Sequence, residues 1–170
     1  PEETCVFTLT HEGYIKRTTL DTYQAQNRGG RGVQGMTQKD EDFTEEMYVG
    51  STHDYMLFLT NQGRVYRLKG YQVPEGSRTA KGSHIVNLLQ LQEGESVTLM
   101  LQQKADVDED NTYATMITKQ GLIKRTQLSQ FRNIRKAGLI AIALNEGDSL
   151  VWSHLTKGDD EIIVATHDGA

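Results

Sequence analysis

The stretch with the clearest chemical character holds two arginines and three glycines within seven residues: Gln26, Asn27, Arg28, Gly29, Gly30, Arg31 and Gly32. Glycine adopts positive φ values and lets the backbone approach a partner closely, and arginine forms paired hydrogen bonds with phosphate oxygens. A short loop of this composition is as often a solvated turn as a binding site. The place of this heptad within a repeat therefore carries the prediction.

The repeat is marked by a Thr, two residues and a Gly, with apolar residues ahead of it. Four copies occur at intervals of roughly 50 residues, the range expected for blade-type β repeats: 10–13, 60–63, 118–121 and 166–169. Strand-like runs flank the turns, such as 55–59 before the second and 64–68 after it. Two such runs joined by a glycine turn predict a β-hairpin, because the glycine supplies the positive φ that a tight turn needs.

Each repeat continues with a hydrophobic run, an acidic turn that contains Gly, and another strand-like run, which in the second repeat are 85–91, 93–95 and 96–101. Four strands per repeat follow, with little room for helix. We predict an all-β, propeller-like fold of four-stranded blades. The repeats lie at approximately 4–50, 51–105 and 111–158, and the next one starts at 159–170.

The heptad lies at a fixed distance from the hairpin turn. Gly32 follows Gly13 by 19 residues, and Gly82 follows Gly63 by the same 19. Residues 76–82 are therefore a degenerate second copy, which keeps two cations and the last glycine. A third copy at 132–138 is two residues closer to its turn and only loosely related.

The heptad resembles the seven-residue box (Gln, Arg, Arg, Gly, Gly, Lys or Arg, Gly) of the C-terminal domain of the DNA gyrase A subunit. Asn27, where that family usually has Arg, is the one departure. The stretches 52–69 and 74–91 are also similar to that domain, so the resemblance covers nearly the whole chain. Topoisomerase IV A subunits have similar blades but an incomplete or degenerate box, which favours the gyrase family.

The resemblance implies a β-pinwheel, a propeller-like array of four-stranded blades. Residues 1–170 would then be a fragment of one such domain, with about three blades and the start of a fourth. A closed ring of six blades needs about 300 residues, and the sequence does not begin with Met. We expect the exposed ends of an open array to be covered by self-association or to be its least ordered parts.

The composition is that of an ordinary soluble domain, with 36% hydrophobic and 24% charged residues. No apolar run approaches the length of a membrane span, and a single cysteine, Cys5, fits a reducing cytoplasm. The net charge of −5 argues superficially against a nucleic-acid partner. However, the bases recur inside the repeats, whereas the acids gather in a few stretches that we interpret as connectors. These acidic stretches are 40–46, 93–95, 106–110, 146–148 and 159–161.

Catalytic and metal sites are not indicated. The histidines are scattered, without a second ligand at metal-binding spacing. Asp106, Asp108 and Asp110 imitate half of a calcium loop, but Asn111 replaces its central Gly, so we expect a disordered acidic loop. The glycines of the heptad lack the Lys and Ser/Thr ending of a P-loop. We therefore predict no catalytic residue and no metal site in this chain.

Binding to duplex DNA is the function that these patterns favour. We predict Arg28 and Arg31 as anchors and Gly29, Gly30 and Gly32 as the residues that shape the loop. The following cations would extend a track along the outer rim: Arg78, Lys81, Lys16, Arg17, Arg64, Arg67, Lys124 and Arg125. Such binding is largely independent of sequence, because it uses the phosphate backbone and the shape of the bent duplex. Any one strand cation has an equally good interpretation as a solvated edge charge.

The resemblance adds what lies beyond the residues themselves. It implies a box that fixes the path of wrapped DNA, so that the intact enzyme, an ATP-dependent topoisomerase and hence an isomerase, introduces negative supercoils. The catalytic tyrosine and the ATP site of that family belong to other domains, so no cofactor is expected here, and ATP and Mg act elsewhere in the holoenzyme. The implied partners are DNA and the remaining parts of the gyrase A and B subunits, in the bacterial cytoplasm at the nucleoid and away from membranes.

Two alternatives stay open. Propeller-type blades also serve as protein-interaction scaffolds, in which loops bind another chain and DNA is irrelevant. The related C-terminal domain of topoisomerase IV is the other alternative. Salt dependence separates the scaffold from the DNA-binding domain, because phosphate binding weakens steeply as salt rises.

Overall fold

The computed structural model describes residues 1–28 and 42–158, and of residues 26–28 it describes the backbone alone. Short antiparallel strands dominate: β1 (Thr4–Thr10), β2 (Tyr14–Thr19), β3 (Thr44–Ser51), β4 (Tyr55–Thr60), β5 (Arg64–Lys69), β6 (Ser83–His84), β7 (Val97–Gln103), β8 (Thr112–Thr118), β9 (Ile123–Gln127), β10 (Leu139–Ile140) and β11 (Leu150–Lys157). Helical segments are the helix α1 (Leu20–Arg28) and the short 3₁₀ helices η1 (Gly70–Gln72), η2 (Ile85–Asn87) and η3 (Leu128–Phe131). The predicted all-β fold of four-stranded blades is confirmed.

The strands form three sheets, in the orders β3-β1-β2-β6, β10-β5-β4-β7 and β11-β8-β9. Three strands of each sheet come from one repeat. In the first and second sheets, a fourth strand comes from the next repeat, since β6 pairs with β2 and β10 pairs with β5. The second and third repeats each contain four strands, as the sequence predicts, but one strand of each pairs with the preceding sheet. Neighbouring repeats are interlocked by the exchanged strand.

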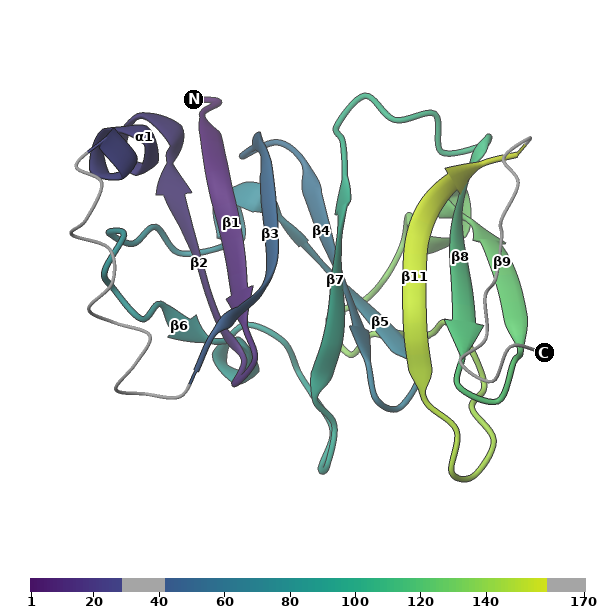
Figure 1. Cartoon of the computed structure of the whole chain (residues 1–170). Coiled ribbons are helices and arrows are strands. Elements are labelled where there is room, and N and C mark those ends of the chain that lie inside the picture. Colours follow the sequence, from purple (N-terminus) through teal and green to yellow (C-terminus); the bar gives the residue numbers. More distant parts are fainter. Residues whose placement is uncertain (29–41, 159–170) are drawn as a thin grey trace.

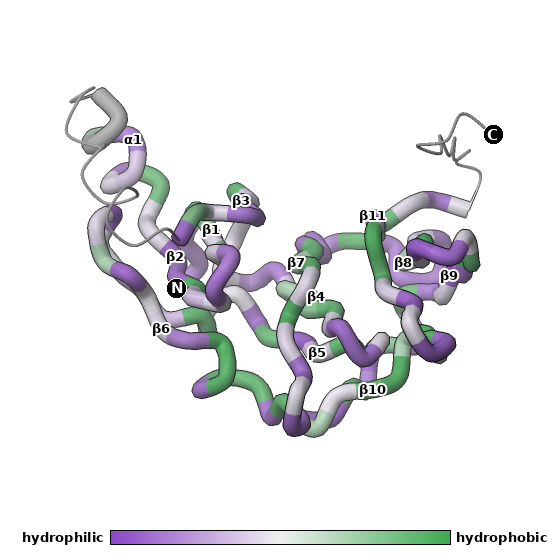
Figure 2. Tube along the Cα trace, turned by 60° about the horizontal axis from the view of Figure 1, so that its bottom comes forward, coloured by the Kyte–Doolittle hydropathy of each residue, from purple (hydrophilic) through white to green (hydrophobic). Residues whose placement is uncertain are grey.

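The three sheets stand side by side along an arch (Figure 1). β3, β7 and β11 lie on its concave side, whereas β5, β6 and β10 lie toward the convex side (Figure 2). The loops that carry β6 and β10 therefore run along the convex side of the arch, which we call the convex margin. The second and third copies of the heptad, residues 76–82 and 132–138, lie on this margin (Figure 2).

The repeated Thr and Gly form the hairpin turns that the sequence predicts. Gly13, Gly63 and Gly121 have φ values of 94°, 76° and 95°. Each donates its N–H to the carbonyl oxygen of the repeat threonine at 3.0 Å. A side chain with a Cβ is strained at such φ values, which explains the glycine.

Each turn threonine binds a carboxylate from later in the chain. Thr60 donates its hydroxyl to Glu95 Oε2 at 2.6 Å, and the equivalent threonines donate to Asp42 and Asp148. Glu95 also accepts from the Tyr66 hydroxyl at 2.7 Å and from the Gln92 N–H at 2.8 Å. Three of the acidic stretches that we interpreted as connectors, 40–46, 93–95 and 146–148, therefore each supply a residue that closes a hairpin.

Helix α1 contradicts the expectation that the repeats leave little room for helix. Thr19 accepts the N–H of Thr22 at 3.3 Å, as an N-cap residue does, and Asp21 lies in the first turn, where its charge complements the helix dipole. These local signals are present in the sequence. The helix is the continuation of β2 and leads directly into the Arg/Gly heptad.

The hydrophobic run 85–91 is not the strand that the sequence predicts. Ile85 and Leu89 are buried, and Val86 and Asn87 are exposed. This spacing is helical and begins with η2, which follows the hydrogen bond from Ile85 N–H to the Gly13 carbonyl at 2.8 Å. Likewise, only Leu139 and Ile140 of the corresponding run in the third repeat form a strand.

Two hydrophobic cores hold the sheets together. One core joins the first and second sheets, and the other joins the second and third. The alternating residues of β4 serve both, because Met56 and Phe58 enter the first core while Leu57 and Leu59 enter the second. The second sheet is thus packed on both faces, which fixes its neighbours relative to one another. No helix within the described residues has the length and apolar character to cross a membrane.

Candidate nucleic-acid interface

The Arg/Gly heptad begins inside α1. The backbone of Gln26, Asn27 and Arg28 forms the last helical residues. Gly29, Gly30, Arg31 and Gly32 lie outside the described residues, as do the side chains of 26–28. The assignment of this heptad as the main DNA contact therefore stays a prediction from the sequence.

The second copy, residues 76–82, is a loop on the convex margin that crosses to the first sheet. It leads into β6, where Ser83 pairs with Ile15 and His84 with Tyr14. Gly82 has a φ of 93°, and a Cβ built on it would lie 2.5 Å from the Ile15 carbonyl oxygen. The last glycine of this copy is therefore required for close packing against the preceding blade.

The third copy, residues 132–138, occupies the equivalent place on the second sheet. It leads into β10, in which Leu139 pairs with Val65. Gly138 has a φ of 79°, and a Cβ on it would lie 2.7 Å from the Tyr66 ring. The second and third copies therefore occupy equivalent structural positions, although their sequences are only loosely similar. We call them loop 76–82 and loop 132–138.

Lys16 and Arg17, on β2, are bound to the segment that contains loop 76–82. Lys16 Nζ donates to the carbonyl oxygens of Ser77, Arg78 and Ala80 at 2.9, 2.6 and 2.8 Å. Arg17 Nε donates to the Val73 carbonyl at 2.7 Å, and Arg17 Nη1 lies 3.6 Å from Glu75 Oε1. Burial, together with the nearby charge of Arg78, lowers the pKa of Lys16.

Arg64 and Arg67, on β5, bind loop 132–138 in the same manner. Arg64 Nη2 donates to the Ala137 carbonyl, and Arg64 Nε lies 3.8 Å from Glu95 Oε2. Arg67 Nη2 donates to the Arg132 carbonyl at 2.5 Å. Four of the strand cations that the sequence placed on a DNA track, Lys16, Arg17, Arg64 and Arg67, are thus bound to main-chain groups of the following repeat.

Other predicted cations lie over tyrosine rings at the surface. Lys81 Nζ is 4.4 Å from the centre of the Tyr14 ring, and the Arg78 guanidinium carbon is 5.2 Å from that of Tyr23. One Arg78 nitrogen, Nη1, is buried and has no hydrogen-bond partner among the described residues. Stacking of this kind holds a cation in place while leaving its hydrogen-bond donors available.

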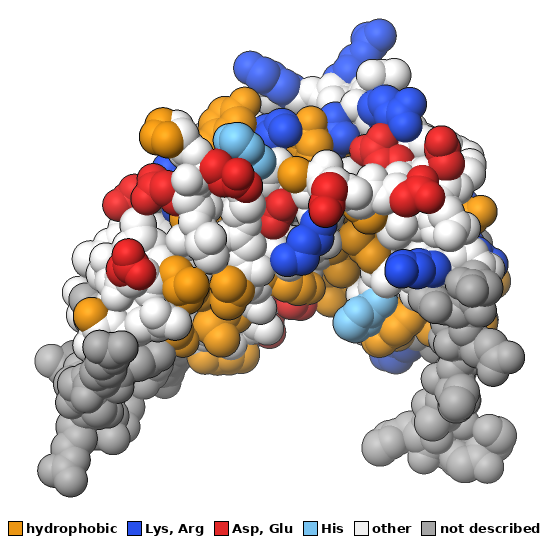
Figure 3. All heavy atoms as spheres, turned by 90° about the horizontal axis from the view of Figure 1, so that it is seen from above, with side chains coloured by type: hydrophobic (Ala, Val, Ile, Leu, Met, Phe, Trp, Pro, Cys, Tyr) orange, Lys and Arg blue, Asp and Glu red, His pale blue; other side chains and the backbone are white. Residues whose placement is uncertain are grey.

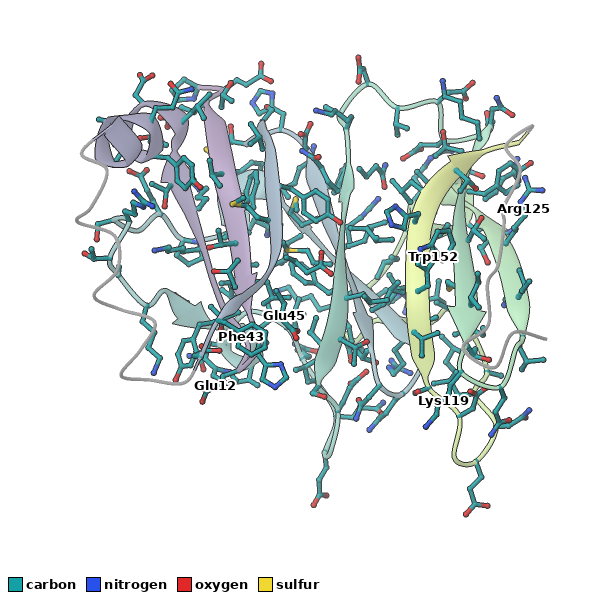
Figure 4. The ribbon with its side chains drawn as sticks, viewed as in Figure 1. Glu12, Phe43, Glu45, Lys119, Arg125 and Trp152 are labelled. Carbon is teal, nitrogen blue, oxygen red and sulfur yellow. The ribbon has the colours of Figure 1, made fainter. Side chains whose placement is uncertain are left out.

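The third repeat also has a cation stacked on a tyrosine ring. Arg125 lies over the Tyr113 ring at 4.2 Å, as Arg67 lies over Tyr55 at 4.1 Å. Both arginines are four residues past a turn glycine and both tyrosines eight residues before it. Arg125 lies at the β9 side of the third sheet (Figure 4), and Lys124 beside it is exposed. The periodic Tyr and Arg were a signal for this pair that the sequence reasoning missed.

Arg135 and Lys136 were left out of the predicted site. They line a cavity of about 680 Å³ on the convex margin, together with Arg67 and the segment 86–92. Loop 132–138 also carries Arg132, whose Nε is bound to Glu109 Oε1 at 2.8 Å. The acidic stretch 106–110, expected to be disordered, is ordered in the structure, and Glu109 accepts a second side chain, Gln103, at 2.9 Å.

Charge is unevenly distributed over the surface. Seen from above, Lys and Arg side chains are numerous along the convex margin, with acidic side chains between them and nearer the middle of the arch (Figure 3). The concave side shows many apolar side chains in the same view. Local positive charge on a body with a net charge of −5 is sufficient to hold a polyanion at short range.

Comparison with known proteins supports one family. The family model for "DNA gyrase C-terminal domain, beta-propeller" matches residues 6–49, 54–103 and 113–157. The chain is 52% identical over 168 residues to the DNA gyrase A subunit of Clostridium acetobutylicum, and 49% identical over 166 residues to that of Staphylococcus epidermidis. These matches cover 99% and 98% of the chain, which spans 20% and 18% of the two relatives.

Two solved structures resemble the fold. The C-terminal domain of DNA topoisomerase IV superposes with a TM-score of 0.74 at 29% identity, and the DNA gyrase A C-terminal domain with 0.67 at 26%. Each match covers 92% of this chain, and 46% and 49% of the respective solved chains. Shape alone therefore does not separate the two kinds of topoisomerase. The identity of about 50% to gyrase A subunits does.

Proposed function

The chain belongs to the DNA gyrase C-terminal domain family, and from that premise we propose that it is a non-catalytic domain that binds duplex DNA and bends it around the convex margin. The two loops that carry the degenerate boxes lie on this margin, one from each of two successive repeats. Each is bound by strand cations of the preceding blade. A duplex that follows the arch would meet one such loop after another.

The observation that carries this proposal is the stacking of margin cations on tyrosines. Lys81, Arg78 and Arg125 are held over aromatic rings at 4.4, 5.2 and 4.2 Å. A cation that is fixed in advance loses less side-chain entropy when it binds a phosphate. Contacts repeated from blade to blade offset the cost of bending DNA, which needs no base-specific contact.

The activity of the whole protein forms part of the same proposal. The domain would act within the A chain of gyrase, together with the B chain, in the bacterial cytoplasm at the nucleoid. The wrapped DNA would be presented to the strand-passage core, so that the holoenzyme introduces negative supercoils. ATP and Mg would be used by other domains, and this chain would need no cofactor. An open arch would also allow self-association.

Ligation of a nicked plasmid with the 170-residue chain bound tests the proposal. DNA that wraps around the protein with one handedness changes the linking number of the ligated plasmid. We expect a shift in linking number that grows with protein concentration. Affinity for a short duplex should also fall about a hundredfold between about 50 and 200 mM salt if roughly four phosphates are contacted. No shift together with no salt-sensitive binding would contradict the proposal and favour a protein-interaction scaffold.

A further inference from the structure

Lys16 has no hydrogen-bond donor left for DNA. A lysine ammonium carries three N–H groups, and Lys16 Nζ lies within 2.9 Å of three carbonyl oxygens, those of Ser77, Arg78 and Ala80. Its side chain is only partly exposed, beneath loop 76–82. A direct phosphate contact by Lys16, as the sequence predicted, would require these bonds to break.

The same three bonds fix the direction of the peptide groups in the loop. A trans peptide is planar, and its N–H points opposite to its carbonyl. The carbonyls of Ser77, Arg78 and Ala80 point toward Lys16, so the N–H groups of Arg78, Thr79 and Lys81 point away from it. Among residues 1–28 and 42–158, none of these three N–H groups has a hydrogen-bond acceptor. Thr79 and Lys81 are exposed.

Outward main-chain N–H groups without an acceptor can bind anions, and the Arg78 and Lys81 side chains beside them add positive charge. We propose that Lys16 is a positioning residue, whose ammonium turns loop 76–82 so that the outward N–H groups of Arg78, Thr79 and Lys81 form a seat for DNA phosphates. This inference rests on the proposed function and names the atoms that act at this loop.

Loop 132–138 provides an internal contrast. Arg64 and Arg67 bind the carbonyls of Ala137 and Arg132, so the corresponding outward N–H groups are those of Gly138 and Asn133. Gly138 already donates its N–H to the Arg135 carbonyl at 2.9 Å. The third repeat also has N–H groups without an acceptor among the described residues, those of Asn133, Arg135, Lys136 and Ala137. Of these peptides, only that of Asn133 has its carbonyl bound by a strand cation. A set of outward N–H groups positioned by one strand cation is therefore specific to the second repeat.

Amide chemical shifts test the seat directly. The 170-residue chain, labelled with nitrogen-15, is titrated with a short duplex of mixed sequence and separately with inorganic phosphate. We expect saturable shifts of the Arg78, Thr79 and Lys81 amides with the duplex. Shifts along the margin that spare these three amides would overturn the seat alone, and absence of any shift would overturn the proposed function with it. A response to inorganic phosphate without one to the duplex would overturn the assignment to DNA.

Lys16→Met keeps most of the side-chain stem and removes the ammonium. We expect the three amide shifts to disappear and affinity for the duplex to fall on the order of tenfold, as for a typical coupling between sites. Lys124→Met removes the same charge from the equivalent position of the third repeat, and the amide shifts at loop 76–82 should persist. Unchanged shifts in Lys16→Met would overturn its positioning role.

A third variant covers the case in which Lys16→Met does not fold. Arg78→Ala combined with Lys81→Ala removes both side-chain cations and keeps the three N–H groups. We expect weaker binding of the duplex, with the amide shifts still present at saturation. Loss of those shifts at saturating duplex would show that the side chains alone bind phosphate, and would overturn the seat.

Discussion

Each of the three hairpin turns in the described part of the chain depends on a carboxylate that lies more than 25 residues away in the sequence. Burial would raise the pKa of Glu95, but the hydrogen bonds from Gln92, Thr60 and Tyr66 outweigh it, and its pKa lies below the usual 4.5. Its side chain is fully buried. At the residue scale, Asp42, Glu95 and Asp148 therefore stabilise the blades.

Glu95→Gln should destabilise the chain by about 2 kcal/mol at neutral pH. The glutamine NH2 group replaces one carboxylate oxygen, so the hydroxyl of Thr60 or Tyr66 that donated to that oxygen faces another donor and loses its acceptor. A lowered pKa in the folded state means that the carboxylate contributes stability above pH 4.5, and that this contribution is lost as the pH falls through the folded pKa. The difference between wild type and variant in urea unfolding should therefore shrink in acid. Glu93→Gln, at an exposed neighbour, should change stability by less than about 0.5 kcal/mol. An equal loss in both variants would contradict the role of Glu95.

His11 joins the first hairpin turn to the start of β3. Its Nδ1 lies 2.9 Å from Glu45 Oε1, and its ring stacks on Phe43 with centroids 4.8 Å apart. The hydrogen bond to Glu45, and then the charge of that residue, raise the pKa of His11 above 6.5. Phe43 and Glu45 lie together at this end of the first sheet, with Glu12 beside them (Figure 4).

Glu45→Gln should lower the pKa of His11 toward 6.5, because the amide keeps a possible hydrogen bond and removes the charge. A raised folded pKa stabilises the chain fully below pH 6.5, and this contribution is lost as the pH rises through the folded value. Nuclear magnetic resonance titration of the His11 ring measures the pKa directly. Glu12→Gln, which removes a charge with a much smaller effect on His11, should leave the pKa nearly unchanged. If both substitutions lowered it equally, the Glu45 bond would not be its cause.

At the scale of elements, the blades are joined by glycines that permit close approach between repeats. Gly82→Ala should cost about 3 kcal/mol, since it combines an unfavourable positive φ with a contact against the Ile15 carbonyl. Gly121→Ala has nearly the same φ, 95° against 93°, but nothing lies within 4 Å of its Cβ. It should cost about 1 kcal/mol. The difference between the two variants in the free energy of unfolding, measured in urea, gives the steric contribution at Gly82. Equal losses of stability would mean that loop 76–82 is not tightly packed against Ile15.

The elements also show what sequence patterns can and cannot predict. The Thr and Gly turns were predicted correctly, because a hairpin turn is decided by neighbouring residues. Helix α1 carried local signals, Thr19 and Asp21, that were overlooked in favour of the strand pattern. The exchange of β6 and β10 could not be read from local patterns, because it depends on the fit of Gly82 and Gly138 against the preceding blade.

At the candidate site, too, features set by neighbouring residues were predicted, and contacts between distant parts of the chain were not. The residue types on the convex margin were recognised, but the partners of the strand cations were not. Lys16 binds carbonyls more than 60 residues away, and no spacing in the sequence indicates that contact. At the scale of the whole molecule, this places cations in two layers. Inner ones, such as Lys16 and Arg64, hold loops, and outer ones, such as Lys81 and Arg125, remain at the surface.

The heptad itself gives the last prediction, which concerns the intact enzyme. Arg28→Ala combined with Arg31→Ala should abolish negative supercoiling by a gyrase holoenzyme that contains this chain, because the wrapped path would lose its anchor. Relaxation and DNA cleavage should persist, since they use other domains. Supercoiling, relaxation and cleavage are each measured by gel electrophoresis of plasmid DNA. Lys104→Ala combined with Lys119→Ala removes the same charge from exposed positions outside the box loops, and should leave supercoiling intact. Parallel loss of all three activities in the arginine variant would contradict wrapping as the role of this domain.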